Sequence, residues 1–295
     1  TNVKPWKILR VDYANTYYDK IYQSLYYFFF INDQPLKELE EKGYFNNSLQ
    51  YHEPYKSWLT SFNKSYGEYM DTEKSWNTDY YQIALSDGIF GLQNDWYESP
   101  SNWKTFNQFF ARHLKSPKQR PITGLDNPDI VVSPADAQPQ GVWAIDSTSK
   151  IIEKEGIAIK SGTLYNVENL IGESSDYEKL FSNGTFTHSF LDVGDYHRYH
   201  FPLSGIVKEI RIIKGESVSG GYTTWDSKNK RYKFDASSVG WQSIETRGCV
   251  ILETEEYGLV ALLPIGMWPV SSVNFEDNLQ VGSEVLKGDM LGYFL

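Results

Sequence analysis

The sequence predicts an α+β protein in which a helical, aromatic-rich N-terminal region is followed by a β-rich domain. Residues 1–100 are dense in Tyr, Trp and Phe, and their apolar side chains recur at helical intervals. After Pro121, short β-rich runs alternate with Gly, Pro, Asn and Asp, which is typical of strands and turns. A chain of 295 residues suits one large domain or two modest ones. We therefore expect a helical accessory region at 1–100 and a β-rich domain at 101–295.

The N-terminal helices are expected at three places, with a bridge to the β-rich domain. Residues 17–27 carry apolar side chains at helical spacing, residues 35–43 have Pro near their start and Gly at their end, and residues 58–69 are a third candidate. Residues 103–114 are also helical in period and are closed by Ser116-Pro117. Aromatic residues at helical spacing most often form core, and a binding groove is the alternative.

In the β-rich part, residues 206–213 alternate well enough to predict a strand with one solvated face. Residues 215–240 are rich in Ser, Gly, Thr and Lys, and we interpret them as a long loop or flap over a site, because such loops are uncommon unless functional or disordered. A helix is expected at 167–171, and further strands at 130–132, 141–145, 250–252 and 259–263.

The net charge of −10 argues against two classes of partner. Nucleic-acid backbones and anionic lipid surfaces both attract Lys and Arg, so neither nucleic-acid binding nor membrane binding is expected. The longest apolar run, residues 25–31, is far shorter than the roughly 20 residues that span a bilayer. We expect a cytoplasmic protein. The sequence starts at Thr1, so an upstream anchor stays open, as does assembly into a homo-oligomer.

Cys249 is the single cysteine, so this sequence holds neither an intrachain disulfide nor a multi-cysteine metal site. It lies in the apolar run 249–252, which favours a small buried core residue.

Residues 192–202 hold two histidines among aspartate, arginine and tyrosine, and they end at a Pro turn. If this segment is extended, His197 and His200 point to opposite faces and have separate roles. If it forms a helical turn, the two share a face and a metal site becomes an option. Because no third ligand of the usual pattern is nearby, no metal is expected.

A second unusual segment is 131–137, where an apolar run ends in Ser-Pro and is followed by Asp136. An aspartate held by such a turn suits a fixed partner for a histidine, as in Ser-His-Asp arrangements, which are defined by geometry. Taken alone, Ser-Pro-x-Asp is more often only a turn.

Together these segments resemble the phosphatidylserine decarboxylase family of pyruvoyl enzymes. The matches run in order over residues 103–295, and the most specific is the Asp-Tyr-His-Arg-x-His-x-Pro signature at 195–202. The other matching segments are Asn-x-Phe-Phe-x-Arg at 107–112, Arg-Pro-Ile at 120–122, Ser-Pro-x-Asp at 133–136, and the stretches 159–170, 253–267 and 285–294.

The resemblance implies a precursor that cleaves itself at a Gly-Ser bond just beyond Leu295. The chain then resembles the larger, β subunit of a processed enzyme, or a truncated one. The cofactor would be a pyruvoyl group made from a serine outside this chain. The expected partners are therefore a small, pyruvoyl-bearing α subunit from the same precursor and a small-molecule amino acid substrate, which forms a Schiff base with the pyruvoyl ketone.

The resemblance also implies roles for individual residues. His200, oriented by Asp136, would be the base for self-cleavage, and His197 would serve proton transfer to the substrate α-carbon. Asp195, Tyr196 and Arg198 are favoured as residues that hold the loop by hydrogen bonds and a salt bridge. Met267 and Trp268 are substrate-pocket candidates, in a segment that departs from the family's Gly-Ala-x-x-Val-Gly pattern.

The substrate is expected to be a free, aromatic L-amino acid such as tryptophan. The aromatic N-terminal region resembles the soluble tryptophan decarboxylase-like subgroup, and Ala137 stands where phospholipid-acting members usually have Gly. The alternative is a phosphatidylserine decarboxylase that makes phosphatidylethanolamine. A remote alternative is a non-catalytic barrel-sandwich binding module or scaffold, because 205–207 and 281–289 resemble the halves of a biotinyl/lipoyl-type domain.

Overall fold

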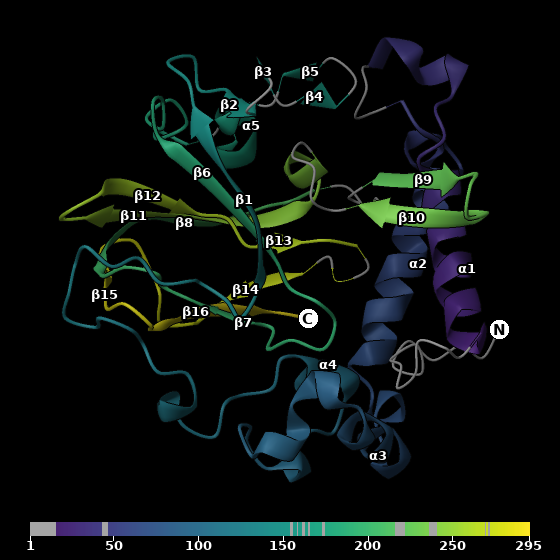
Figure 1. Ribbon diagram of the computed structural model, residues 1–295, viewed down its shortest axis with the longest axis horizontal. Coiled ribbons are helices and arrows are strands. Elements are labelled where there is room, and N and C mark those ends of the chain that lie inside the picture. Colours follow the sequence, from purple (N-terminus) through teal and green to yellow (C-terminus); the bar gives the residue numbers. More distant parts are fainter. Residues whose placement is uncertain are drawn as a thin grey trace.

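In the computed structural model, helices make up the N-terminal part of the chain and antiparallel sheets make up most of the rest (Figure 1). The predicted α+β class is confirmed. The structure describes residues 16–42, 47–153, 156–157, 159–160, 163–164, 166–172, 175–215, 222–235, 241–268, 270 and 272–295.

Two long helices, α1 (Thr16–Asn32) and α2 (Tyr55–Met70), are followed by α3 (Thr78–Ser86) and α4 (Phe106–Phe110). The helices predicted at 17–27 and 58–69 are thus present, and α5 (Val167–Ile171) lies where predicted. Short 3-10 helices occupy Lys37–Lys42, Leu49–Tyr51, Glu73–Ser75, Gly88–Phe90, Leu92–Asn94, Pro100–Asn102, Pro117–Gln119 and Trp241–Ser243. No helix among the described residues combines the length and the apolar character needed to cross a membrane.

The helix expected over 103–114 is much shorter in the structure. It begins with a capping box, in which Thr105 and Gln108 each accept a hydrogen bond from the other's backbone N–H. After Phe110 the chain leaves the helix, and the Ala111 carbonyl accepts a hydrogen bond from Arg198 Nε at 2.8 Å. Bonds to a segment far along the chain therefore override the local helical period.

The strands form three larger sheets and two hairpins, and every recorded strand pair is antiparallel. The four-stranded sheet has the order β3 (Gly156–Ile157), β2 (Ile151–Glu153), β1 (Gln138–Ile145) and β6 (Thr185–Phe190). The five-stranded sheet has the order β12 (Gly258–Leu262), β11 (Thr246–Thr254), β8 (Gly205–Ile213) and β15 (Glu284–Val285), with β13 (Ile265–Gly266) also on β11. The three-stranded sheet has the order β14 (Val273–Phe275), β16 (Met290–Phe294) and β7 (Arg198–His200). The hairpins are β9 (Tyr222–Asp226) with β10 (Arg231–Asp235), and β4 (Ile159–Lys160) with β5 (Thr163–Leu164).

Strand β11 lies between two hydrophobic cores because its side chains alternate between faces. Val250 and Leu252 belong to the core that also contains β7, β14 and β16 side chains. Cys249 and Ile251 belong to the core shared with α5 and β1. Burial of Cys249 is thus confirmed, and it raises the pKa of the thiol to about 12. The five-stranded sheet is accordingly the middle layer between the other two sheets (Figure 1).

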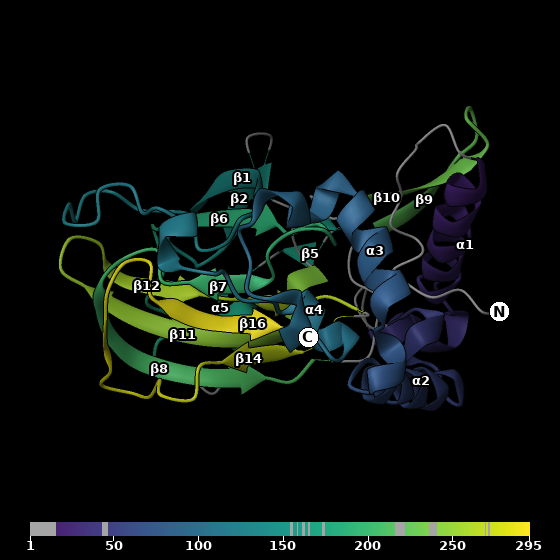
Figure 2. The ribbon, with the colours of Figure 1, turned by 90° about the horizontal axis from the view of Figure 1, so that it is seen from below.

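The expectation of a loop over 215–240 is wrong for its central part, which is the β9–β10 hairpin. This hairpin lies against α1 in both views (Figures 1 and 2). Gln23 binds both backbone groups of Tyr232, and the Phe234 ring stacks on Tyr26 with centroids 5.9 Å apart. The aromatic residues therefore give the hairpin an apolar face that packs against α1. A loop made only of polar residues would have no such face. Residues 216–221 and 236–240 of the expected loop lie outside the described residues, as do 161–162 and 165 of the family-like stretch 159–170.

Two aromatic clusters hold the helical region. One centres on Phe29, Leu59 and Trp268, so part of the apolar run 25–31 is buried between α1 and α2. The other runs from Met70 to Phe109, and Phe106 packs against both this cluster and the core of the sheets. Aromatic packing therefore continues past residue 100, and the division into 1–100 and 101–295 stays a prediction.

Candidate active site

Strand β7 brings the two histidines of the signature next to the C-terminal strand. His200 lies opposite Met290 of β16, and Arg198 lies opposite Tyr293. The backbone N–H of Phe294 donates to the His197 carbonyl at 3.0 Å. The segment is therefore extended, as one of the two predicted alternatives requires, and the described residues contain no group of three or more His, Cys, Asp or Glu placed to hold a metal ion.

The Ser-Pro-x-Asp segment runs along the other edge of β7. The His200 N–H donates to the Pro134 carbonyl at 2.7 Å, and the Val132 N–H donates to the Pro202 carbonyl at 3.2 Å. The strand predicted at 130–132 is therefore not a regular strand, but its backbone is held beside β7. Two motifs distant in the sequence thus meet, and Asp136 is carried to the vicinity of His200.

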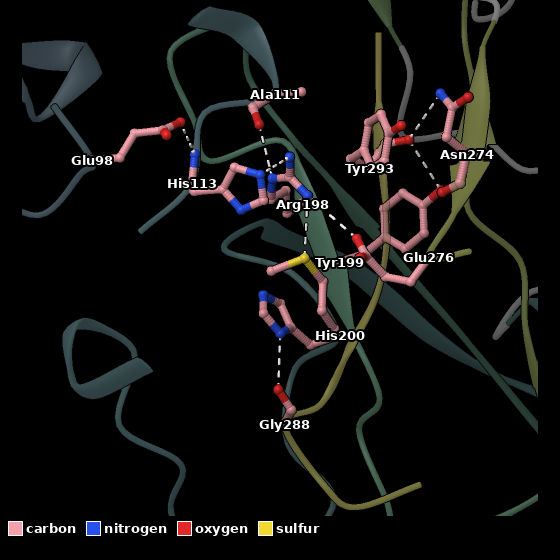
Figure 3. Close-up of polar contacts among 11 residues, drawn as sticks. Glu98, Ala111, His113, Arg198, Tyr199, His200, Asn274, Glu276, Gly288 and Tyr293 are labelled. Atoms are coloured by element: carbon pink, nitrogen blue, oxygen red, sulfur yellow. Dashed lines mark hydrogen bonds and ion pairs between the residues drawn. The ribbon is translucent and has the colours of Figure 1, made fainter. Parts of the chain in front are cut away.

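His200 is a buried, neutral imidazole with one free ring nitrogen. Its Nδ1 lies 2.9 Å from the Gly288 carbonyl oxygen (Figure 3). A carbonyl oxygen only accepts, so Nδ1 carries the proton and Nε2 carries the lone pair. Nε2 is buried and has no hydrogen-bond partner among the described residues. Burial, with the positive charge of Arg120, lowers the His200 pKa to about 4, so the ring is uncharged at neutral pH and its Nε2 lone pair is unprotonated.

The predicted hydrogen bond between Asp136 and His200 is not formed. The Asp136 carboxylate instead accepts from Arg120 Nε at 2.9 Å, and Arg120 also donates to the Ser133 carbonyl at 2.8 Å. A guanidinium is a stronger partner for a carboxylate than a neutral imidazole, because both groups are charged. Asp136 still acts on His200 through its charge, which raises the pKa of the histidine against the larger effect of burial.

His197 occupies a different environment. Its ring stacks on Phe110 with centroids 3.8 Å apart, and its Nε2 lies 3.4 Å from the Val193 carbonyl oxygen. Burial and the charge of Arg112 lower the His197 pKa to about 3. The two histidines are therefore both uncharged, but they face different neighbours.

Arg198 links three parts of the site (Figure 3). Its guanidinium donates to His113 Nε2 at 2.7 Å and pairs with Glu276 at 3.3 Å. Burial and the Arg198 charge lower the pKa of His113, which therefore stays neutral and accepts the bond. These contacts include the salt bridge expected of Arg198. The partners His113 and Glu276 were missed, because nothing in their local sequence points to an arginine so far along the chain.

Arg112 is a second buried arginine that sequence reasoning did not assign to the site. Its guanidinium donates to the carbonyls of Gly194 at 2.7 Å and Asp195 at 3.0 Å, and it lies 4.4 Å from the centroid of the Tyr97 ring. Arg112 thereby ties the segment that follows α4 to the loop before His197. Its position in the Asn-x-Phe-Phe-x-Arg segment was the only available signal.

The structure does not place Trp268 with the histidines. Trp268 is buried between α1 and α2, with the Phe28 and Phe29 rings 5.5 and 5.4 Å away, and its indole N–H donates to Asn63. A large ring with a satisfied N–H packs as core, which argues against its predicted role in a substrate pocket. Met267 is partly buried, and its carbonyl accepts from the Val270 N–H. Pro269 and Ser271 of this segment lie outside the described residues.

An open cavity of about 560 Å³ lies in the helical region, lined by Trp76, Tyr81 and Trp103 among others. It shares no residue with the surroundings of His197 and His200. The cavity is separate from the histidines, and the binding groove considered for the aromatic residues stays a prediction.

Comparison with known proteins points to one family. A profile described as phosphatidylserine decarboxylase matches residues 106–295. The chain is 34% identical over 207 residues to phosphatidylserine decarboxylase proenzyme 3 of Schizosaccharomyces pombe, covering 70% of this chain and 19% of the relative. It is 30% identical over 200 residues to proenzyme 2 of Oryza sativa, covering 65% and 28%, and 30% identical over 201 residues to the proenzyme of Fusobacterium nucleatum, covering 68% and 59%. The chain thus spans less than two thirds of each of these relatives.

Proposed function

This chain belongs to the phosphatidylserine decarboxylase family, and we propose that it is the β-subunit part of a pyruvoyl-dependent carboxy-lyase. The proposed precursor cleaves itself just beyond Leu295. The single observation that carries the proposal is His200, a buried, neutral imidazole whose Nε2 lone pair has no partner among the described residues. A base held in this state is what a serine nucleophile requires.

The proposed substrate is phosphatidylserine, which would be converted to phosphatidylethanolamine. The relatives in the comparison are named for phosphatidylserine, and the family profile covers both β7 and β16. The expectation of a free aromatic amino acid rested on the N-terminal region, which lies outside the profile, and on the single residue Ala137 within it. The order of the two substrate hypotheses is therefore reversed.

The residues present fit a pyruvoyl group that is generated beside this chain. When bound, that group supplies a carbonyl that accepts the electrons left by departing CO₂. In the proposed maturation, His200 Nε2 takes the proton of the precursor serine hydroxyl, while the Gly288 carbonyl holds the ring through Nδ1–H. The charge of Asp136 stabilises the imidazolium that results.

His197 is proposed to hold the proton destined for the substrate α-carbon. Its stacking on Phe110 fixes the ring plane, and its burial keeps water away from the nitrogens. Because its pKa is low, the ring is neutral before turnover and would carry the proton only briefly.

The test is to express the full precursor and follow both maturation and turnover. We expect intact-mass analysis to show two chains, the smaller blocked by a pyruvoyl group, and we expect CO₂ release from phosphatidylserine vesicles. Parallel assays with tryptophan, tyrosine and phenylalanine examine the other substrate class. An uncut precursor without turnover would refute the enzyme proposal, and turnover of a free amino acid alone would restore the first substrate hypothesis.

A further inference from the structure

The backbone at the end of β16 is hydrogen-bonded by side chains that come from both neighbouring strands or lie next to them. Tyr199 comes from β7, Asn274 comes from β14, and Ser272 lies just before β14. All three contact the backbone of residues 293–295, which in the proposed precursor leads directly into the segment that is cleaved.

Tyr199 bridges the two outer strands across the end of β16. Its buried hydroxyl donates to the Asn274 carbonyl oxygen at 2.6 Å and also lies 3.2 Å from the Tyr293 carbonyl oxygen, so its one hydrogen is shared between two acceptors (Figure 3). Its ring packs on Phe294 with centroids 4.9 Å apart. The buried hydroxyl has a raised pKa because burial disfavours the phenolate, so it remains a donor at neutral pH.

Gly292 shows how closely the strands approach here. A Cβ at this position would lie 1.9 Å from the Asn274 carbonyl oxygen and 2.8 Å from Cε2 of Tyr199. Only glycine fits without displacing the backbone of β14. The space that a side chain would need is taken up by the contact between Tyr199 and β14.

Ser272 uses its full hydrogen-bonding capacity on this segment. Its Oγ accepts from the Leu295 N–H at 3.1 Å and from Asn274 Nδ2 at 3.2 Å, and it donates to the Leu295 main-chain oxygen at 3.2 Å. A hydroxyl has one donor and two acceptor positions, so all of them are occupied. Asn274 Nδ2 also lies 3.4 Å from the Tyr293 carbonyl oxygen.

We infer that Ser272, Asn274 and Tyr199 are positioning residues for self-cleavage. They fix the direction in which the chain leaves β16 toward the bond that is cleaved in the proposed precursor. The inference rests on the proposed function. It assigns no chemistry to these residues: they act by restricting the segment to a reactive geometry, on which rates depend steeply.

The test measures the half-time of self-cleavage in the full precursor, by gel and intact mass, together with the melting temperature. For Ser272→Ala and Tyr199→Phe we expect cleavage to slow by about 10- to 100-fold, since small misplacements have effects of this size. Ser272→Thr keeps the hydroxyl and should cleave like the parent. Once cleaved, the slowed variants should turn over substrate at the parent's rate per mature site.

Ser283→Ala is the matched control, because Ser283 Oγ likewise accepts a backbone N–H, from Gln280 at 3.0 Å, but in a different turn. It should leave the half-time unchanged. The inference fails if Ser272→Ala and Tyr199→Phe both cleave within about twofold of the parent, or if Ser283→Ala slows cleavage equally. If Ser272→Ala does not fold, the result for Tyr199→Phe tests the inference by itself. Tyr199→Phe removes only one oxygen atom and is therefore the less disruptive change. A parent that never cleaves refutes the proposed function instead.

Discussion

The helical region and the surroundings of β7 are both well packed, but they bury different chemistry. In the helical region, rings pack against rings, as where Trp76 stacks on Phe109 at 4.2 Å and Trp268 lies among the side chains of α1 and α2. Around β7, four groups that can carry a positive charge, Arg112, His197, Arg198 and His200, are each at most 6% exposed. Burying such groups is costly unless they are neutral or well bonded. The contrast matches the proposed function, in which the residues around β7 carry the chemistry and the helical region contributes stability.

The largest effect is expected from His200→Ala in the full precursor. Loss of a general base typically slows a reaction by about 10²- to 10⁴-fold, so self-cleavage should nearly stop. His52→Ala, a histidine in the helical region, should cleave like the parent. Gel analysis over time gives both rates, and equal cleavage of the two variants would contradict the assignment of the base.

Trp268→Ala probes the other side of the comparison. Truncating a buried tryptophan should lower the free energy of unfolding by about 3–5 kcal/mol, as urea denaturation would measure. Trp58→Ala, whose side chain is 50% exposed, should lower it by about 1 kcal/mol or less. Folded Trp268→Ala precursor should still cleave and turn over normally. Impaired turnover in folded protein would instead support the pocket role predicted for Trp268, with Trp268→Phe as the milder variant.

Glu276→Gln tests whether the buried ion pair at β7 contributes more to stability than an exposed ion pair does. The Arg198 and Glu276 side chains are 7% and 30% exposed, and the change leaves a buried guanidinium without its counter-charge. We expect a loss of about 1–3 kcal/mol of unfolding free energy. Glu68→Gln breaks the exposed pair with Lys64 on α2 and should change stability by no more than about 0.5 kcal/mol. Similar losses in the two variants would show that the pair at β7 is no different from a surface contact.

A gradual dependence of stability on pH is also expected. The pKa values of His197 and His200 lie near 3 and 4, below the ordinary value of 6.5. Between about pH 6.5 and 4 the unfolded chain therefore binds protons that the folded chain does not, and stability falls as the pH falls. The expected slope is about 1.4 kcal/mol per pH unit for each histidine.

His197→Phe keeps a ring against Phe110 but cannot titrate, so it should flatten this slope in urea unfolding at pH 7, 6 and 5. An unchanged slope would mean that His197 is not buried as a neutral group.

The sequence by itself determined much of the local structure and the choice of candidate site residues. Helical spacing located α1 and α2, and period-two alternation located β8. The apolar run around Cys249 located part of β11 and predicted the burial of Cys249. These features depend on neighbours within a few residues, which a linear pattern records. The motif residues Asp136, His197 and His200 were also found this way, from their unusual density of polar groups and from the family resemblance.

Only the tertiary structure decided how those groups are paired. Arg120 binds Asp136, the Gly288 carbonyl orients His200, and Arg198 joins His113 to Glu276. The same holds for the early end of α4 and for the hairpin within 215–240, which Arg198 and α1 respectively stabilise. Each of these contacts requires two segments that are distant in the sequence to approach within about 3 Å, the range of a hydrogen bond. The spacing of residues along the chain does not show which segments approach this closely.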